Sequence, residues 1–414
     1  MNFTISKSLF YDALQKVVGV VPPKTTISIL TCILLELEEN TLRITGTDLE
    51  ISVTLSLNVN RLEDGAVAIP ARLLLEIVRE LPDVPLNIVS EGEERIVLKT
   101  DKGEYKISTH PREDFPKTNV EEGEFHFPLQ SKVLDHMINK TIFAVSADEL
   151  RPALTGILME LFPTEIRFVA TDGHRLARIV YQYDLPPEAI QNKVILPTKA
   201  LNLLLRNLEP DKDVDVQIGE DHIVFTLENS TIYSKLISGM YPNYERVIPQ
   251  DNDKKLQVNR ELLISTLRRV SIFSNSLTHQ VRFVLTSDEL TIHSEDIEFG
   301  AEATEVISAK YQGEWLQIGY NSAYLMDVLR HLDSEEVIFE LKNAVSAAIM
   351  YPPEQETDEN VTMLLMPIRL TDEDAEEDEE ENENEAESEP VYEADSTTEE
   401  NEQPDEGDAE EINE

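Results

Sequence analysis

One short segment of the chain, residues 170–176, combines side chains that could do chemistry. Asp172 and His174 stand two residues apart, so they could act as a general acid–base pair or as two metal ligands. The sequence supplies no third ligand at regular spacing, no His-Glu-x-x-His, no Gly-x-Ser-x-Gly and no Gly-rich phosphate loop. Aspartate and glycine after an apolar run are typical of a tight turn. We therefore expect a turn with no catalytic residue, no metal and no cofactor, and keep an enzyme using Asp172 and His174 as a minor alternative.

The aspartate of this segment recurs at a fixed period. Segments 45–50, 169–174 and 293–298 look alike, and their aspartates, Asp48, Asp172 and Asp296, are each 124 residues apart. A fixed period indicates one structural unit used three times. Because the first and third copies have no Gly-His after the aspartate, we expect the aspartate to serve the turn and the middle copy to carry an additional function.

The elements that position these turns also repeat. Apolar residues at helical spacing predict two helices per copy, at 6–18, 71–81, 130–140, 198–208, 259–271 and 321–332. Segments such as 52–57 and 213–218 alternate apolar and polar residues, which predicts antiparallel strands. The sequence therefore predicts an α+β fold of three repeated domains, at 1–120, 121–252 and 253–370.

Charge divides the chain into a folded part and a tail. Residues 371–414 contain 24 acidic residues and no Lys or Arg, so 57 acids and 35 bases, a net of −22, remain in residues 1–370. A tail of this composition cannot bury enough apolar surface and is predicted to be disordered. It could repel DNA or acidic partners locally, or only keep the protein in solution.

Basic residues concentrate on the six predicted helices. These windows hold twelve bases and six acids, whereas the rest of residues 1–370 has a net charge of −28. A basic surface on an acidic protein is typical of sequence-independent binding to a polyanion such as DNA, and ordinary solvated helix faces are the alternative. The helix residues proposed for DNA are Arg72, Arg79, Lys199, Arg206, Arg268 and Arg269.

Cysteine usage and the N-terminus indicate a compartment. Cys32 is the single cysteine and lies in an apolar run, which excludes an intrachain disulfide and favours a reducing environment. The first residues lack the features of a signal peptide, and prolines interrupt the most apolar stretch, 17–37. We expect a cytoplasmic protein with no membrane partner.

Three segments give the chain a resemblance to a known family. Residues 45–50, 170–177 and the closing Met366-Pro367-Ile368-Arg369-Leu370 resemble the beta subunit of bacterial DNA polymerase III, the replicative sliding clamp, over essentially all of residues 1–370. The resemblance implies a head-to-tail homodimeric ring around duplex DNA, with sheets outside and helices inside. Its partners would be the polymerase catalytic subunit, the clamp loader, and other repair and replication proteins. A monomeric peptide-binding hub is the alternative that never closes into a ring.

The resemblance also implies site residues. A pocket for short peptides containing Gln and Leu or Phe would be lined by Leu154, Thr171, Gly173, His174, Arg175, Leu176, Pro242, Arg246, Val247, Asn321, Tyr324, Val345, Leu364, Met366, Pro367, Ile368 and Arg369. Pro152, Ala153 and Thr278 stand where relatives often have aromatic residues, so the pocket mouth is expected to differ. Lys24 matches a DNA-contact position, and Tyr105, Ile107, Ile272 and Phe273 match the dimer interface.

Overall fold

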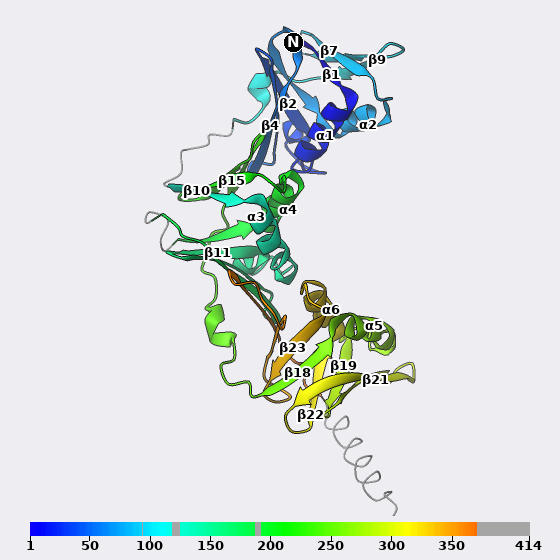
Figure 1. Cartoon of the computed structure of the whole chain (residues 1–414). Helices are drawn as coiled ribbons and strands as arrows, with labels where there is room; N and C mark the ends of the chain where they lie inside the picture. Colours follow the sequence, from blue (N-terminus) through cyan, green and yellow to red (C-terminus); the bar gives the residue numbers. More distant parts are fainter. Residues whose placement is uncertain (93, 118–124, 187–191, 371–414) are drawn as a thin grey trace, which may run out of the picture. The chain divides into compact units, whose positions relative to one another are not determined.

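The structure is a computed structural model that describes residues 1–92, 94–117, 125–186 and 192–370. The predicted tail, 371–414, and the predicted boundary between residues 120 and 121 lie outside the described residues. Three repeats of one unit follow one another along the chain (Figure 1).

Each repeat contains two helices, and the six predicted helices are confirmed with ends displaced by at most two residues. The first repeat has β1 (Asn2–Ser6), α1 (Lys7–Val18), β2 (Cys32–Glu38), β3 (Thr41–Thr47), β4 (Ile51–Asn58), β5 (Asn60–Glu63), β6 (Gly65–Pro70), α2 (Ala71–Glu80), β7 (Pro85–Glu91), β8 (Arg95–Lys99) and β9 (Glu104–Ser108).

The second repeat has the same order of elements except that it has one strand fewer between its two helices. It comprises β10 (Phe125–Gln130), α3 (Ser131–Asn139), β11 (Gly156–Phe162), β12 (Glu165–Thr171), β13 (Arg175–Gln182), β14 (Lys193–Pro197), α4 (Thr198–Asn207), β15 (Asp213–Ile218), β16 (His222–Thr226) and β17 (Ser230–Lys235).

The third repeat closes the described part of the chain. It comprises β18 (Lys254–Asn259), α5 (Arg260–Val270), β19 (Gln280–Leu285), β20 (Glu289–Asp296), β21 (Ala301–Gln312), β22 (Leu316–Asn321), α6 (Ser322–Arg330), β23 (Glu336–Leu341), β24 (Ala348–Tyr351) and β25 (Glu359–Leu365). Short 3-10 helices include η3 (Ile142–Ala144) after α3 and η7 (Ser271–Phe273) after α5.

Local sequence accounts for where the helices start and which side they bury. The side chains of Ser6, Asn259 and Asn321 accept backbone N–H groups at the starts of α1, α5 and α6, which satisfies donors that the helix leaves free. Helix α2 is amphipathic: Leu74 and Val78 are buried, whereas its basic residues are exposed.

Antiparallel strands from neighbouring repeats join into shared sheets. One sheet has the order β10-β15-β16-β17-β4-β3-β2-β6, in which β17 of the second repeat pairs with β4 of the first. Another runs β14-β11-β12-β13-β25-β24-β23-β18-β21-β20-β19-β22, in which β25 of the third repeat pairs with β13 of the second. We call these pairings the first junction (β4–β17) and the second junction (β13–β25).

Two strands correspond to the strands that form the junctions but have no partner strand along one edge in the part of the chain that the structure describes. In the five-stranded sheet β5-β1-β7-β8-β9, strand β9 is the last strand, as β17 and β25 are the last strands of their repeats. Residues 301–308 of β21 pair with β20, and only its end, from Ala309, pairs with β18. Among the described residues, β9 and the first part of β21 are therefore the unpaired counterparts of the strands that form the two junctions.

The core is continuous through the repeats and apolar. Large side chains such as Phe3, Phe127 and Phe283 are fully buried, and Cys32 is a buried free thiol. No helix among the described residues is long and apolar enough to cross a membrane.

Candidate functional site

The three repeated aspartates close turns. Oδ1 of Asp48 accepts the N–H groups of Glu50 and Ile51 at 3.0 and 2.7 Å. Oδ1 of Asp172 accepts those of the residues two and three positions on, at 2.8 and 3.0 Å. Oδ1 of Asp296 accepts the N–H of Glu298 at 3.1 Å. The prediction that the shared aspartate serves the turn is confirmed.

Asp172 and His174 have separate surroundings. Oδ2 of Asp172 accepts from Arg175 Nε at 3.1 Å, and the His174 ring stacks on Tyr324 with centroids 5.9 Å apart. The two side chains form no hydrogen bond with each other in the described part of the chain. That part also contains no group of three or more His, Cys, Asp or Glu residues placed to hold a metal ion.

Arg175 is the centre of the second junction. Its guanidinium donates to Asp327 on α6 at 2.7 Å and to the Phe143 carbonyl at 2.7 Å, in addition to Asp172. It also lies 4.6 Å from the centroid of the Tyr324 ring. Because a buried charge is tolerated only when it is paired and hydrogen-bonded, this arrangement fixes the second and third repeats to each other.

An apolar cluster lies next to Arg175 at the same junction. Leu176 pairs with Leu364 across β13 and β25, and both side chains are buried with Ala347 and Tyr244 in one cluster. The His174 carbonyl accepts the N–H of Met366 at 2.8 Å, which places Met366 directly beside the turn. Side chains predicted for a peptide pocket from distant parts of the sequence therefore meet at the second junction.

The predicted pocket residues divide into buried and exposed groups. Leu154, Thr171, Arg175, Leu176 and Leu364 are buried, whereas Gly173, His174, Pro242, Arg246, Val247, Val345, Met366 and Arg369 are exposed, and Asn321, Tyr324, Pro367 and Ile368 are intermediate. Met366 and Val345 are 40% and 56% exposed, which leaves apolar surface for a ligand. Asn321 caps α6 and donates to the Thr278 carbonyl at 3.0 Å, so its position is fixed by the fold.

A hollow of about 710 Å³ adjoins this region, and the sequence did not predict it. Leu158, Ile195 and residues 239–245 line it, and Pro242 is the one predicted pocket residue among its lining. At its base the Tyr244 hydroxyl donates to Glu160 at 2.5 Å, and burial raises the pKa of Tyr244 above its usual range. The sequence offered no signal for this hollow because Glu160 and Tyr244 are 84 residues apart.

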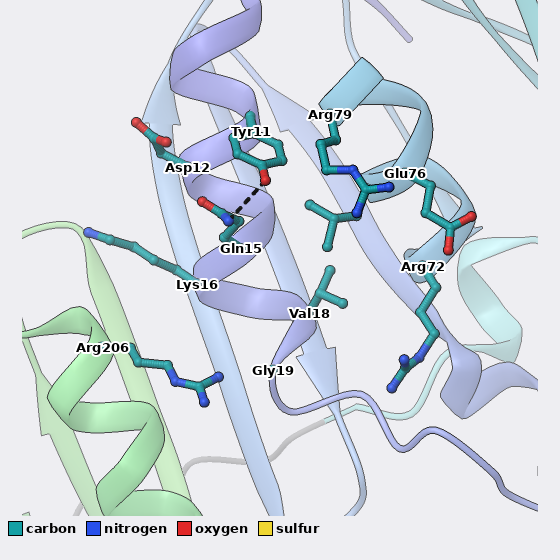
Figure 2. Close-up of a pocket in the computed structure, with 11 residues that line it drawn as sticks. Tyr11, Asp12, Gln15, Lys16, Val18, Gly19, Arg72, Glu76, Arg79 and Arg206 are labelled. Atoms are coloured by element: carbon teal, nitrogen blue, oxygen red, sulfur yellow. Dashed lines mark hydrogen bonds between the residues drawn. The ribbon is translucent and has the colours of Figure 1, made fainter. Parts of the chain in front are cut away.

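A basic groove lies between α1 and α2. Its volume is about 910 Å³, and Figure 2 shows basic side chains from three helices around it. The charged residues of its lining are Lys16, Arg72, Arg79, Arg206, Asp12 and Glu76. Four cations against two acids give a positive surface in an otherwise acidic protein, and such a surface attracts phosphates.

The remaining predicted DNA residues lie in different surroundings. Lys24 and Arg268 are exposed. Arg269 forms an ion pair with Glu305, with N–O distances of 2.8 and 2.5 Å. The Lys199 ammonium donates to the Val20 carbonyl at 3.0 Å and is paired with Asp48. Lys199 is thus already engaged at the first junction.

The predicted interface residues also differ in exposure. Tyr105 on β9 is 37% exposed, whereas Ile107 on the same strand is 2% exposed and belongs to the core. Ile272 and Phe273 in η7 are 77% and 37% exposed. Ile107 therefore cannot contact a second copy directly, and it can contribute to an interface only by holding β9 in position against the core.

Comparison with known proteins gives a consistent assignment. The family models of the DNA polymerase III beta subunit match as N-terminal domain (residues 1–119), central domain (residues 128–243) and C-terminal domain (residues 245–369). The beta sliding clamp of Pseudomonas aeruginosa is 34% identical over 372 residues, covering 89% of this chain and all of the relative. The beta sliding clamp of Escherichia coli K12 is 33% identical over 373 residues, with the same coverage.

Solved structures agree with the sequence comparison. A P. aeruginosa sliding clamp bound to griselimycin superposes with a TM-score of 0.85 at 34% identity, covering 89% of this chain and 100% of that one. The Bacillus subtilis clamp superposes with a TM-score of 0.84 at 28% identity, covering 90% and 100%.

Three repeats with antiparallel sheets and two helices each define the DNA clamp fold. The chain belongs to the bacterial DNA polymerase III beta subunit family. It is a DNA sliding clamp, which encircles duplex DNA and tethers the replicative polymerase so that synthesis is processive. The predictions of family, fold and function are confirmed.

Proposed function

We propose that two copies of the chain close head to tail into a ring that has no enzymatic activity of its own. The observation that carries this proposal is the pair of open edges on β9 and β21. At both junctions within the chain, the last strand of one repeat pairs with the strand that follows the aspartate turn of the preceding repeat. If β9 of one copy pairs with β21 of the other, the same contact is repeated and no open end remains.

Exposed apolar side chains support the same pairing. Tyr105 projects from β9, and Ile272 and Phe273 in η7 lie beside β20 and β21. Burying such side chains between two copies is favourable by about 25 cal/mol per Å² of apolar surface. The proposed interface thus uses the residues predicted from the sequence, with Ile107 beneath them.

The basic groove between α1 and α2 is the proposed DNA-facing surface. Arg79 and Arg206 in the groove, together with Lys24, Arg268 and Arg269, would contact phosphates without reading bases. Contacts of this kind leave the ring free to move along the duplex. A polymerase tethered to it rebinds as an intramolecular partner at an effective concentration that reaches the millimolar range for short tethers.

The exposed apolar surface at the second junction is the proposed peptide pocket. Met366 and Val345 would hold the Leu or Phe of a partner peptide, and the backbone beside His174 would offer polar contacts. The proposed ligands are segments of the polymerase catalytic subunit, the clamp loader, and other replication and repair proteins. The P. aeruginosa clamp bound to griselimycin is a relative that holds a ligand.

Sedimentation and retention on circular DNA test the ring. The full chain should sediment as a species of two 47.0 kDa chains. Once loaded by its clamp loader on a nicked circular plasmid, it should stay bound in salt that dissociates ordinary contacts, and should leave when the plasmid is cut. A monomer in solution, or equal retention on circular and linear DNA, would refute the ring.

Charge reversal tests the DNA-facing surface. Arg268→Glu with Arg269→Glu should weaken loading or retention and reduce the salt dependence by roughly one unit of slope per lost phosphate contact. The matched control reverses Arg43 on β3 and Lys212 after α4, two exposed bases that are not among the proposed DNA contacts. Equal effects from both pairs would contradict the assignment.

A further inference from the structure

A cation bridges the aspartate turn to a backbone carbonyl at the first junction. Lys199, the second residue of α4, donates to the Val20 carbonyl, and Val20 lies just after α1. The same ammonium is paired with Oδ2 of Asp48, whose Oδ1 closes the turn. We call this pair of acceptors, the turn carboxylate and the carbonyl after the first helix of the repeat, the junction cradle.

The second junction has the same cradle with a different cation. Arg175 donates to Oδ2 of Asp172 at 3.1 Å and to the carbonyl of Phe143, in η3 after α3, at 2.7 Å. The second residue of α6 is Ala323, which has no charge to offer. The cation therefore comes from the turn itself, and it reaches α6 through Asp327 instead.

The third repeat has the parts of a cradle and no cation in it. Asp296 is 8% exposed, and its Oδ1 closes the turn as in the other repeats. η7 packs beside β20 as η3 packs beside β12. Within the described ranges, no Lys or Arg forms an ion pair with Asp296. A carboxylate at this degree of burial favours a positively charged partner.

The first repeat has a basic residue in the position that corresponds to Lys199. Helices α2 and α4 both begin directly after a proline, and their second residues are Arg72 and Lys199. Arg72 is exposed and has no hydrogen-bond or ion-pair partner among the described residues. Arg72 is therefore the first-repeat counterpart of Lys199, just as Asp296 is the third-repeat counterpart of Asp48.

We propose that Arg72 of each copy binds Asp296 of a second copy, so that a third cradle closes each contact between copies. This inference rests on the head-to-tail dimer proposed above and names the charged pair that holds it. It also assigns Arg72 to the contact between copies and not to DNA, although Arg72 borders the basic groove (Figure 2).

The turn in the third repeat suits a partner that comes from another copy. The innermost paired residues of the three hairpins are Thr47 and Ser52, Thr171 and Leu176, and Asp296 and Ala301, so the third turn has the same length but begins after its aspartate and not at it. Its apolar side chains Ile297 and Phe299 are 80% and 81% exposed, beside the open edge of β21. A second copy paired with that edge would cover them.

Mixing two charge-reversed proteins tests the pair directly. Arg72→Glu alone places two negative charges at both contacts, and Asp296→Arg alone places two positive charges there. Each homodimer should dissociate at a concentration about tenfold or more above that of the unaltered chain. In a one-to-one mixture, each contact regains opposite charges, so heterodimers should form in preference to both homodimers. Native mass spectrometry of differently labelled full-length chains counts the three species.

Two further variants separate the pair from the fold of the turn. Asp296→Asn keeps an oxygen for the Glu298 N–H and removes the charge, so it should speed subunit exchange several-fold while leaving unfolding unchanged. Arg79→Glu, on the same helix and already paired with Glu80, is the control and should leave exchange unchanged.

The outcomes distinguish this inference from the proposal on which it rests. If the unaltered chain is monomeric, the ring itself is wrong. If it is dimeric but the reversed chains mix statistically, or if Asp296→Asn exchanges at the unaltered rate, the ring stands and the Arg72–Asp296 pair is wrong. Preferential heterodimers together with faster exchange support the pair.

Discussion

The two junctions within the chain have the same strand pairing but different charged side chains. At the first, Lys199 reaches across from α4 to a half-buried Asp48, and its own side chain is 44% exposed. At the second, Arg175 belongs to the turn, is 10% exposed, and holds Asp172, Asp327 and a carbonyl together. The first junction relies mainly on strand pairing, whereas the second adds a buried ionic centre.

The difference follows from three residues of the turn. Leu49, Glu50 and Ile51 in the first repeat correspond to Gly173, His174 and Arg175 in the second. Leu49 and Gly173 share a left-handed backbone, with φ of 79° and 94°. The backbone contact is the same at both junctions, because the Glu50 carbonyl accepts the N–H of Lys235 just as the His174 carbonyl accepts the N–H of Met366. The side chains therefore make the difference. A shared fold thus carries the proposed peptide pocket at one junction and a plain contact at the other.

The largest effect should come from the buried cation of the second junction. Arg175→Met should lower the free energy of unfolding by about 3 kcal/mol, because Asp172 and Asp327 lose their shared partner in a buried site. Urea denaturation followed by circular dichroism measures the loss. Arg151→Met, which removes a half-exposed pair with Asp148, is the control and should cost less than about 1 kcal/mol. Similar losses for both would contradict a special role for Arg175.

A smaller effect, confined to binding, should follow from truncating the exposed apolar surface. Met366→Ala should weaken the binding of a short peptide containing Gln and Leu or Phe about tenfold, which equals about 1.4 kcal/mol. Fluorescence polarisation measures the affinity, and sedimentation should show an unchanged dimer. Leu62→Ala, at an exposed apolar residue on β5, is the control. Unaltered peptide affinity for Met366→Ala would remove Met366 from the pocket.

The first junction should respond more weakly than the second. Lys199→Met should cost about 1 kcal/mol or less, since the ion pair with Asp48 is partly solvated. The control is Lys132→Met, which alters the second residue of α3, an exposed lysine with no ion pair among the described residues. A loss as large as that of Arg175→Met would erase the contrast between the junctions.

The smallest effect concerns the backbone of the two turns. Leu49→Gly should stabilise the protein by at most about 1 kcal/mol, because its left-handed backbone strains a leucine and not a glycine. Gly173→Ala should destabilise by a similar amount, although a Cβ there would meet only the Arg151 side chain at 3.5 Å. Thermal unfolding checks both. Destabilisation by Leu49→Gly would show that the leucine contributes more by contact than it loses by strain.

Local sequence was sufficient to predict the helices and the turn aspartates. The apolar spacing of α2, with Leu74 and Val78, fixes its buried face by periodicity alone. Asp172 closes its turn through atoms two and three residues away, so its role is encoded within the segment. The roles of residues whose partners lie far along the chain were harder to predict from the sequence. Ile107 and Tyr105 look alike in sequence, and only the packing of β9 separates the buried one from the exposed one.

Lys199 and Arg206 show that the sequence also does not predict the partners of charged residues. Both are basic residues on α4, and composition predicts one role for them. The structure gives Lys199 two acceptors in the first repeat, 151 and 179 residues away, and leaves Arg206 in the groove. Charge can be counted from the sequence, but its partners depend on which segments the fold brings together.

The sequence by itself determined the number of repeats, the helices, the closing turns and the family, because each depends on periodicity or on contacts between near neighbours. Only the tertiary structure decided which cations are engaged at the junctions, which strands keep an open edge and where Met366 lies. Those features depend on pairing between strands such as β13 and β25, whose residues Arg175 and Leu365 are adjacent only once the chain has folded. A repeated sequence can specify each unit, but the contacts between units, where the copies differ, arise from packing in three dimensions.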